Sequence, residues 1–231
     1  MIKEKEINEF LTKKPAEEIL RYCLDTFGPQ VAFSTSLGAE DQVITHMLVQ
    51  LNRPVKIFTL DTGRMFPETY EVLEATNKHF GIDIEIYFPD YKKVQQMVRE
   101  RGINLFYQTI ENRKLCCSIR KKEPIERALR GMQAWISGLR KDQSVERFFT
   151  PTAEWDEQYQ LYKLNPLLEW TEKQVWDYIK KYNIPYNKLH DKGFRSIGCQ
   201  PCTRAIKPDE DFRAGRWWWE EKEKKECGLH S

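Results

Sequence analysis

Residues 33–43, FSTSLGAEDQV, join a predicted strand to a predicted helix. The residues QVAFSTS (30–36) are typical of a buried strand, and EDQVITHMLVQL (40–51) is typical of a helix. The loop between them offers three hydroxyls, a glycine and a helix N-terminus, which together indicate a phosphate site in a doubly wound sheet. It lacks the Gly-Lys-Ser/Thr ending of a Walker A loop and is not a GxGxxG sequence. A plain strand-to-helix turn capped by Ser36 is the alternative.

Strand and helix patterns alternate on both sides of this loop. Further strands are predicted at 54–61 (PVKIFTLD), 82–88 (IDIEIYF), 133–138 (QAWISG) and 160–166 (QLYKLNP), and further helices at 17–28, 67–80, 91–102 and 113–130. Such alternation indicates an α/β fold with a doubly wound, mostly parallel sheet covered by helices on both faces. We expect the strand order 3-2-1-4-5, with Pro124 as an irregularity or a boundary in the last helix.

The character of the sequence changes after Pro166. Residues 170–182, WTEKQVWDYIKKY, open with a capping box at Thr171 and Gln174 and predict a helix, after which residues 183–204 are loop-like. We therefore expect a Rossmann-like nucleotide-binding domain at 1–166 and a C-terminal extension at 167–231. The extension is expected to pack on the sheet domain, so that both form one structural domain.

Two further loops follow predicted strands and extend the candidate site. They are LDTGRMFPETY (60–70) and ISGLRKDQS (136–144). Ligands of open α/β sheets bind outside the carboxyl ends of strands where the strand order reverses. The order 3-2-1-4-5 places the ends of strands one and four at that crevice, with Asp61 and Arg64 alongside. The residues expected to face one ligand there are Ser34, Thr35, Ser36, Gly38, Arg140 and Lys141. Solvated loops are the alternative for each charged residue.

Composition narrows the function classes. The chain has 231 residues and a formal net charge of +2, so bulk charge does not favour nucleic acid or a membrane surface as a partner. The N-terminus has no apolar signal-peptide core, and no apolar run approaches the roughly 20 residues of a membrane span. A cytoplasmic location is expected, where thiols stay reduced. In that compartment the six cysteines are expected to bind metal or to take part in catalysis more often than to form disulfides.

Four of these cysteines form two pairs, Cys116–Cys117 in KLCCSIRKKEP and Cys199–Cys202 in IGCQPCTR. Two pairs of soft ligands indicate a metal site. Adjacent cysteines are a poor zinc knuckle but reach two different irons of a cubane, which favours a [4Fe–4S] cluster over zinc. A zinc staple between the extension and the sheet domain is the alternative. Lys121 follows the first pair and could offset a cluster's charge or reach an anion, whereas Cys23 is interpreted as a small buried hydrophobe.

A last cysteine, Cys227, lies near the C-terminus in KKECGLHS. Chain ends are usually poorly ordered, so this thiol is either accidental or a nucleophile on a mobile tail. The aromatic run Trp217–Trp219 is interpreted as a core anchor for the base of that tail. A docking surface for a protein reductant is the second interpretation.

These motifs, in this order, resemble one family. FSTSLGAEDQV, LDTGRMFPETY, CCSIRKKEP, ISGLRKDQS, GCQPCTR, RAGRWWWE and KKECGLH together resemble the assimilatory adenylyl-sulfate reductases of the iron–sulfur type, within the phosphoadenylyl-sulfate reductase family. The resemblance implies a fold of the PP-loop, adenine nucleotide α-hydrolase-like type. It also implies reduction of adenosine 5′-phosphosulfate (APS) to sulfite and AMP, with thioredoxin or glutaredoxin as the reductant.

The resemblance also implies roles for individual residues. Cys227 would be the nucleophile, and Cys116, Cys117, Cys199 and Cys202 would hold a [4Fe–4S] cluster. The phosphosulfate would lie near Lys121, Arg213, Arg216 and His230. The rest of the ligand would contact Ser34, Thr35, Ser36, Gly38, Ala39, Glu40, Asp61, Thr62, Gly63, Arg64, Gly138 and Arg140.

The implied chemistry agrees with the residues present. A thiolate is the natural attacker of the phosphosulfate sulfur and would form an S-sulfocysteine. An external dithiol is then required, because no CxxC lies beside Cys227 to resolve the product. This route supplies both electrons, so we expect a structural and electrostatic role for the cluster.

Several alternatives stay open. They are a 3′-phosphoadenylyl-sulfate (PAPS) reductase, an enzyme of dual specificity, and a zinc-stapled nucleotide-binding module without catalysis. A PP-loop ATP-using enzyme is disfavoured, because STSLGAED departs from an SGGxDS loop. The sequence leaves self-association into a homo-oligomer open.

Overall fold

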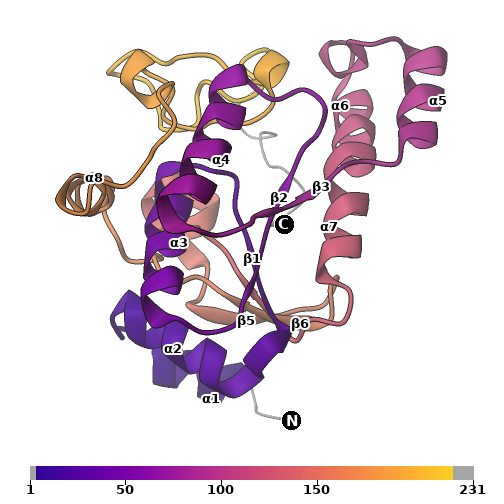
Figure 1. Cartoon of the computed structure of the whole chain (residues 1–231). Helices are drawn as coiled ribbons and strands as arrows, with labels where there is room; N and C mark the ends of the chain where they lie inside the picture. The colour runs from indigo at the N-terminus through magenta and orange to yellow at the C-terminus, as the bar shows by residue number, and fades with distance from the viewer. Residues whose placement is uncertain (1–3, 221–231) are drawn as a thin grey trace. The chain divides into compact units, whose positions relative to one another are not determined.

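The computed structural model describes residues 4–220, apart from the side chains of Val145 and Glu146 (Figure 1). Cys227 and His230 lie outside the described residues. The chain forms two compact units. The sheet unit contains residues 4–59, 68–85 and 131–187, and the cysteine unit contains residues 60–67, 86–130 and 188–220. This division differs from the expected boundary at 166, because each unit takes residues from both sides of it.

The sheet has six strands in the order β3-β2-β1-β4-β6-β5. Their bounds are β1 Val31–Ser34, β2 Lys56–Leu60, β3 Glu85–Tyr87, β4 Ala134–Ile136, β5 Ala153–Asp156 and β6 Leu161–Leu164. β1 pairs in parallel with β2 and β4, and β4 pairs in parallel with β6, as the predicted order 3-2-1-4-5 requires. The prediction of a doubly wound α/β fold is thereby confirmed, and β1 and β4 are the two strands that flank the reversal of order.

One edge strand, β5, was not predicted from the sequence. β5 runs antiparallel to β6, and Gln160 adopts φ +53° in the tight connection between them. A short turn suffices for an antiparallel pair, so no crossover helix marks the strand in the sequence. Its residues, AEWD, also lack the continuous apolar pattern of a strand that is buried on both faces.

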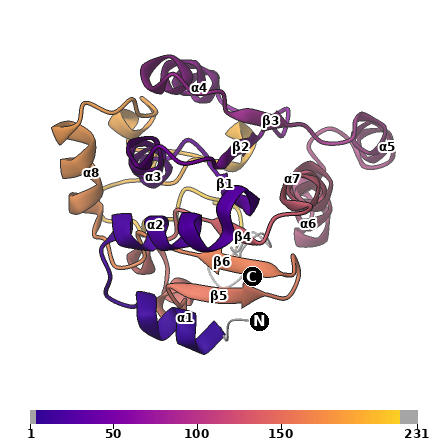
Figure 2. The same cartoon turned by 60° about the horizontal axis from the view of Figure 1, so that its bottom comes forward.

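The helices of the sheet unit form one apolar core together with the strands, and Figure 2 shows where these helices lie. They are α1 Glu4–Leu11, α2 Ala16–Phe27, α3 Ala39–Leu51, α4 Pro67–Phe80 and α8 Glu172–Lys181. α3 packs against both α2 and α8, which accounts for its near-continuous burial. α8 begins with the predicted capping box, in which Thr171 Oγ1 accepts a hydrogen bond from the Gln174 amide. The helix that follows the FSTSLGAEDQV loop is therefore held on two sides.

The cysteine unit is built on a helical segment interrupted by a π-helical turn. α5 (Tyr91–Arg101) is followed by the short turn η2 (Leu105–Tyr107), α6 (Ile110–Cys117), the π-helical turn η3 (Ser118–Lys122) and α7 (Glu123–Leu129). The irregularity predicted at Pro124 is this turn, because proline lacks the N–H that would continue the helical ladder. The cysteine pair of α6 therefore lies directly before the π-helical turn.

The C-terminal part of the cysteine unit, residues 188–220, contains the short turns η6 (His190–Lys192) and η7 (Gln200–Cys202). An isolated bridge joins Thr203 to Arg216, and the Trp217 amide donates to the Cys202 carbonyl at 3.1 Å. A second apolar core contains Met97, Leu105, Phe106, Cys202 and Trp217. This core fixes the second cysteine pair against α5 and η2.

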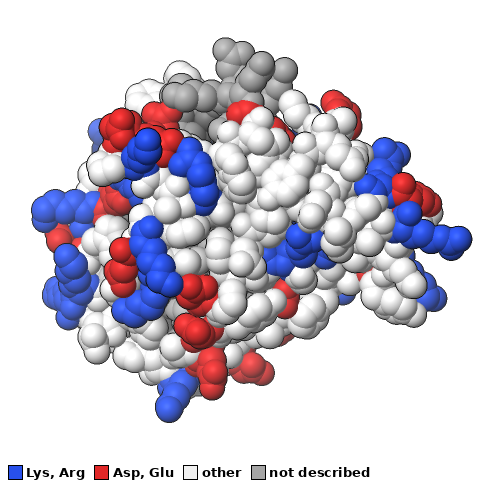
Figure 3. Space-filling model, turned by 90° about the horizontal axis from the view of Figure 1, so that it is seen from above, with Lys and Arg blue, Asp and Glu red and all other residues white. Residues whose placement is uncertain are grey.

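The surface carries both signs of charge. Lysine and arginine side chains are intermixed with aspartate and glutamate on the face shown in Figure 3, consistent with the net charge of +2. Within the part of the chain that the structure describes, no helix is long and apolar enough to cross a membrane.

Candidate active site

The loop after β1 in the sheet unit is organised around Asp41. The amide and the hydroxyl of Ser36 both donate to Asp41 Oδ2 at 2.6 Å. The Leu37 amide donates to Thr35 Oγ1 at 3.0 Å, and Leu37 itself adopts φ +61°. Gly38 is the N-cap residue of α3, and no side chain at that position makes a capping hydrogen bond to the helix. The predicted phosphate loop therefore exists as a hydroxyl-rich turn, but an internal carboxylate holds the donors of Ser36.

Asp41 was not among the predicted site residues. It is 7% exposed, and burial raises the pKa of its carboxyl to about 7, although the hydrogen bonds from Ser36 act in the opposite direction. An acidic residue in the first turn of a helix is common and usually solvated. The sequence therefore gave no sign that this one would be buried beneath the loop.

The end of β4 meets this loop, as the strand order predicts. Gly138 has no side chain, and a β-carbon there would overlap Asp41 Oδ1 and lie 3.3 Å from the β-carbon of Glu40. The backbone of the β4 loop thus approaches the start of α3 more closely than any other residue type allows. Glu40, Asp41 and Gly138 form one contiguous group at the carboxyl ends of β1 and β4.

Arg140 lies fully buried in the same group. Its Nε donates to Glu40 Oε1 at 2.8 Å, its Nη1 to the Trp170 carbonyl at 3.2 Å, and it also pairs with Asp142. The predicted contact of Arg140 with an anionic ligand stays a prediction. In this structure the guanidinium charge is matched by two carboxylates, and the side chain braces the β4 loop against α3.

Lys141, the second predicted cation of the rim, is ion-paired with Glu169. Gln143 Nε2 donates to Glu40 Oε1 at 3.0 Å, so Glu40 receives hydrogen bonds from two residues of the β4 loop. The rim is therefore an internally neutralised network, and its anion-binding capacity depends on backbone N–H groups and hydroxyls as well as on cations.

The residues Asp61–Arg64 belong to the cysteine unit. The Gly63 amide donates to Asp61 Oδ1 at 2.7 Å in a tight turn, with Gly63 at φ +70°. Thr62 Oγ1 lies 3.2 Å from Cys199 Sγ, and the Thr62 carbonyl accepts a hydrogen bond from Arg120. Arg64 is held by the Ile103 carbonyl at 3.1 Å. This predicted ligand loop is thus built directly onto the cysteines.

All four paired cysteines line one cavity of the cysteine unit. Cys116 and Cys117 end α6, Cys199 directly precedes η7, and Cys202 is the last residue of η7. The other residues that line this cavity are Arg64, Phe106, Arg113, Arg120, Lys121 and Pro201. Within residues 4–220, no three His, Cys, Asp or Glu side chains converge closely enough to hold a single metal ion. The four thiols instead surround a common space.

Burial raises the pKa of two of these thiols, Cys116 and Cys202. It raises the pKa of Cys202 to about 12, an effect to which Cys199 adds and which Lys121 and Arg216 oppose. Burial also raises the pKa of Cys116, and the Arg120 guanidinium opposes that shift. The thiols of Cys116 and Cys202 thus face a set of cations at the cavity wall.

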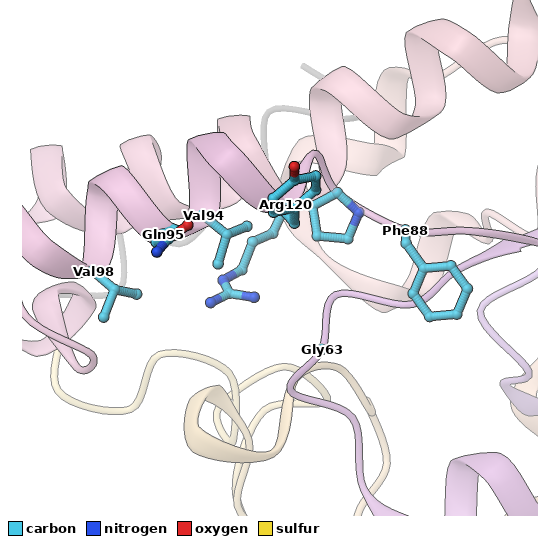
Figure 4. A pocket seen from close by; sticks show the side chains of 8 residues that line it. Gly63, Phe88, Val94, Gln95, Val98 and Arg120 are labelled. Carbon is cyan, nitrogen blue, oxygen red and sulfur yellow. The ribbon is translucent and has the colours of Figure 1, made fainter.

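Arg113 and Arg120 were missed by the sequence analysis, although their spacing carried a signal. Arg113 stands four residues before Cys117, and Arg120 four residues after Cys116, so each shares a helical face with a cysteine. Arg120 is 6% exposed and also borders a neighbouring cavity of about 520 Å³ in the cysteine unit. Its guanidinium points from η3 into the space between α5 and the turn at Gly63 (Figure 4).

The residues predicted to lie near the phosphosulfate differ in their surroundings. Lys121 lines the cysteine cavity. Arg216 is 7% exposed and donates from Nη1 to the Ile197 carbonyl at 3.3 Å. Arg213 stacks on Trp217, with its guanidinium carbon 6.0 Å from the ring centroid. His230 and the predicted nucleophile Cys227 lie outside the described residues.

The fold and the strand-end loop define an α/β protein of the adenine nucleotide α-hydrolase-like class. Structural comparison agrees: an FMN adenylyltransferase from Candida glabrata in complex with ATP aligns over 96% of this chain and 74% of its own, with TM-score 0.57 and 16% identity, which shows the fold alone. A PAPS reductase from Candida auris in complex with phosphate aligns with TM-score 0.75 and 29% identity, over 89% of this chain and 98% of its own.

Sequence comparison identifies the family. Residues 30–205 match the phosphoadenosine phosphosulfate reductase domain, and the chain belongs to that family. The adenosine 5′-phosphosulfate reductase of Allochromatium vinosum is 50% identical over 87% of this chain and 78% of its own length. That of Burkholderia cepacia is 48% identical over 87% of this chain and 80% of its own. That of Pseudomonas aeruginosa is 44% identical over 96% of this chain and 84% of its own.

Proposed function

We propose that this chain is an APS reductase of sulfate assimilation, which converts APS to sulfite and AMP by thiol chemistry. The observation that carries this proposal is the meeting of all four paired cysteines at one cavity, in a chain about half identical to proteins named for that activity. The described cysteines are free thiols, and thiols stay reduced in the cytoplasm, which is the location that we propose.

The sheet unit supplies the nucleotide site in this proposal. The turn of residues 35–38 places hydroxyls and backbone N–H groups at the start of α3, a helix whose N-terminus favours a phosphate group. Gly138 permits the close approach of the β4 loop at the same place. A phosphate bound here competes with Asp41 for the donors of Ser36, or is admitted when Asp41 is protonated.

The four cysteines would hold a [4Fe–4S] cluster. Three buried N–H groups near them, Arg120 Nε, Arg216 Nε and Trp217 Nε1, have no hydrogen-bond partner among the described residues. Sulfur atoms of a bound cluster accept such hydrogen bonds, and the cations Arg64, Arg120 and Lys121 would balance its negative charge. When bound, the cluster supplies a fixed scaffold and an electrostatic field, and no electron from it is needed.

The chemistry proceeds through Cys227. Its thiolate attacks the sulfur of APS, the bond from that sulfur to the bridging oxygen breaks, and AMP leaves. The product on the enzyme is S-sulfocysteine. In this proposal Lys121 and Arg216, whose charges both act on Cys202, would stabilise the phosphosulfate charge during this step.

An external dithiol completes the turnover. One of its thiolates attacks the Cys227 sulfur, sulfite departs with the electron pair of the S–S bond, and a mixed disulfide forms. The second thiolate then releases Cys227 and leaves the partner as a disulfide. The partner is therefore a two-electron donor of the thioredoxin or glutaredoxin class.

Intact-mass measurement tests the first step. The iron-loaded protein is incubated anaerobically with APS and no reductant, and one added SO₃ is expected, with none in Cys227→Ser. A wild-type protein that never gains SO₃ contradicts the mechanism. Metal analysis tests the cofactor, because iron with acid-labile sulfide supports the cluster and one zinc per chain supports the staple instead.

PAPS is the second candidate substrate, because the C. auris structure with TM-score 0.75 is a PAPS reductase. The ratio of kcat/KM for APS and PAPS decides between them. We expect APS to be preferred, since the relatives that are 48–50% identical to this chain are named for APS.

A further inference from the structure

Glu220, which follows the three consecutive tryptophans, is held by a buried ion pair. Arg113 Nε donates to Glu220 Oε1 at 2.6 Å, and the two side chains are only 1% and 3% exposed. The Arg113 guanidinium also lies 4.5 Å from the centroid of the Trp217 ring, which is fully buried. The Glu220 amide donates to the Trp217 carbonyl at 2.9 Å. Glu220 is therefore fixed in place through both its backbone and its carboxylate.

The same ion pair reaches the cysteines. Arg113 belongs to α6, the helix that ends in Cys116 and Cys117, and its side chain lines the cysteine cavity. From the other side, the Trp217 amide donates to the Cys202 carbonyl at 3.1 Å. Both cysteine pairs are thus connected to Glu220 by one or two direct contacts within the cysteine unit.

Glu220 also lies a short distance from Cys227 along the sequence. Cys227 follows it by seven residues in the sequence, and seven residues of fully extended backbone span about 25 Å at most. A shorter tether from a fixed point raises the effective concentration of a reactive group near that point. A buried pair costs more to form than an apolar contact and is best explained where it specifies one arrangement.

The geometry points to Arg113 and Glu220 as a positioning pair that sets the starting point of the Cys227 segment relative to the cysteine cavity. This inference rests on the proposed function, because it assigns the pair to the step in which Cys227 attacks APS. Neither side chain touches the reacting atoms. Their effect is on how often the thiolate reaches the substrate sulfur.

Two half-reactions separate this role from general stability. The first is SO₃ transfer to Cys227, followed by rapid-quench intact mass with APS and no reductant. The second is sulfite release from purified S-sulfocysteine enzyme on addition of thioredoxin. In Glu220→Gln we expect the first rate to fall about tenfold, because small displacements of a reacting group carry large rate penalties. We expect the second rate to stay within about twofold, because the partner approaches from solution and does not require the fixed starting point.

A matched control is available in the same segment. Arg204 and Glu210 form an ion pair of the same length, 2.6 Å, but with side chains 37% and 26% exposed. Glu210→Gln should leave both half-reactions within about twofold. Glu220→Asp keeps the charge and should retain more of the first rate than Glu220→Gln. Iron content and the thermal midpoint are measured for every variant.

The outcomes are distinct. Equal slowing of both half-reactions, an unchanged first rate, or the same loss in Glu210→Gln would overturn the positioning role. If Glu220→Gln does not fold, Glu220→Asp decides by the same comparison of the two rates. A wild-type protein that forms no adduct contradicts the proposed function itself, whereas a normal adduct rate in Glu220→Gln contradicts the positioning pair alone.

Discussion

The Asp41 carboxylate occupies the space that a side chain on Gly138 would fill. These two residues lie 97 positions apart in the sequence, and a β-carbon on Gly138 would overlap Asp41 Oδ1. Asp41 in turn holds the amide and hydroxyl of Ser36 at 2.6 Å. The conformation of the loop after β1 therefore depends on the absence of a side chain after β4.

Gly138→Ala is expected to disturb this contact directly. The added methyl group must displace Asp41 and its bonds to Ser36, which should cost about 1–3 kcal/mol of unfolding free energy. AMP affinity, measured by calorimetry, should fall at least about tenfold as the loop donors move. Combining it with Asp41→Ala should restore part of the lost stability, and strict additivity of the two changes would contradict the proposed overlap.

Asp41 should also make stability depend on pH. Its pKa is raised to about 7 in the folded protein, so between pH 4 and 7 the folded state holds a proton that the unfolded state releases. This contribution is complete at pH values below the unfolded pKa and is lost as the pH rises to 7. Relative to Asp41→Asn, the wild type should lose about 1 kcal/mol per pH unit between pH 5 and 7 in urea unfolding. A difference between the two proteins that does not change with pH would refute this.

The two neighbouring tryptophans should differ in their effect on stability. Trp217 is fully buried among the guanidinium groups of Arg113 and Arg216, so Trp217→Ala should cost about 3–5 kcal/mol. Trp218 is 39% exposed, and Trp218→Ala should change the unfolding free energy by less than about 1 kcal/mol. Similar losses in both variants would count against this assignment. The KM for thioredoxin in Trp218→Ala tests the docking interpretation of the exposed ring.

Cysteine replacement should separate ligands from a core residue. Single serine variants of Cys116, Cys117, Cys199 and Cys202 are expected to lose most of the iron and the brown colour. Cys23 is fully buried in α2, in the core of the sheet unit, so Cys23→Ala should keep a full complement of iron. Iron retained by any two of the four ligand variants would contradict the proposed site.

The parallel core of the fold was predictable because its strands are nearly continuous apolar runs between recognisable helices. The first three residues of VAFS and all of AWI are buried, and the two strands pair as the strand order requires. The antiparallel strand β5 was not predictable in the same way. An edge strand joined by a short turn needs neither an apolar run nor a crossover helix, and AEWD has neither.

Some features of the candidate site were also predictable from the sequence, and others were not. The two cysteine pairs were identified by ligand type and spacing, and the structure brings them to one cavity. Arg140 was predicted as an anion-binding cation from its place in the loop, yet it is fully buried and paired with Glu40, 100 residues away. The type of a charged residue and its loop are visible in the sequence, but the group that neutralises it is not.

The sequence by itself determined the positions of the parallel strands, the loops at their carboxyl ends, the four paired cysteines and the family. Each depends on local patterns or on residue identity, which the chain carries wherever it is folded. Only the tertiary structure decided that Asp41 is buried under the loop, that Glu40 neutralises Arg140, and that Arg113 holds Glu220 across 107 residues. The pKa and the available charge of a side chain depend on the groups packed around it, and long-range packing alone brings those groups together.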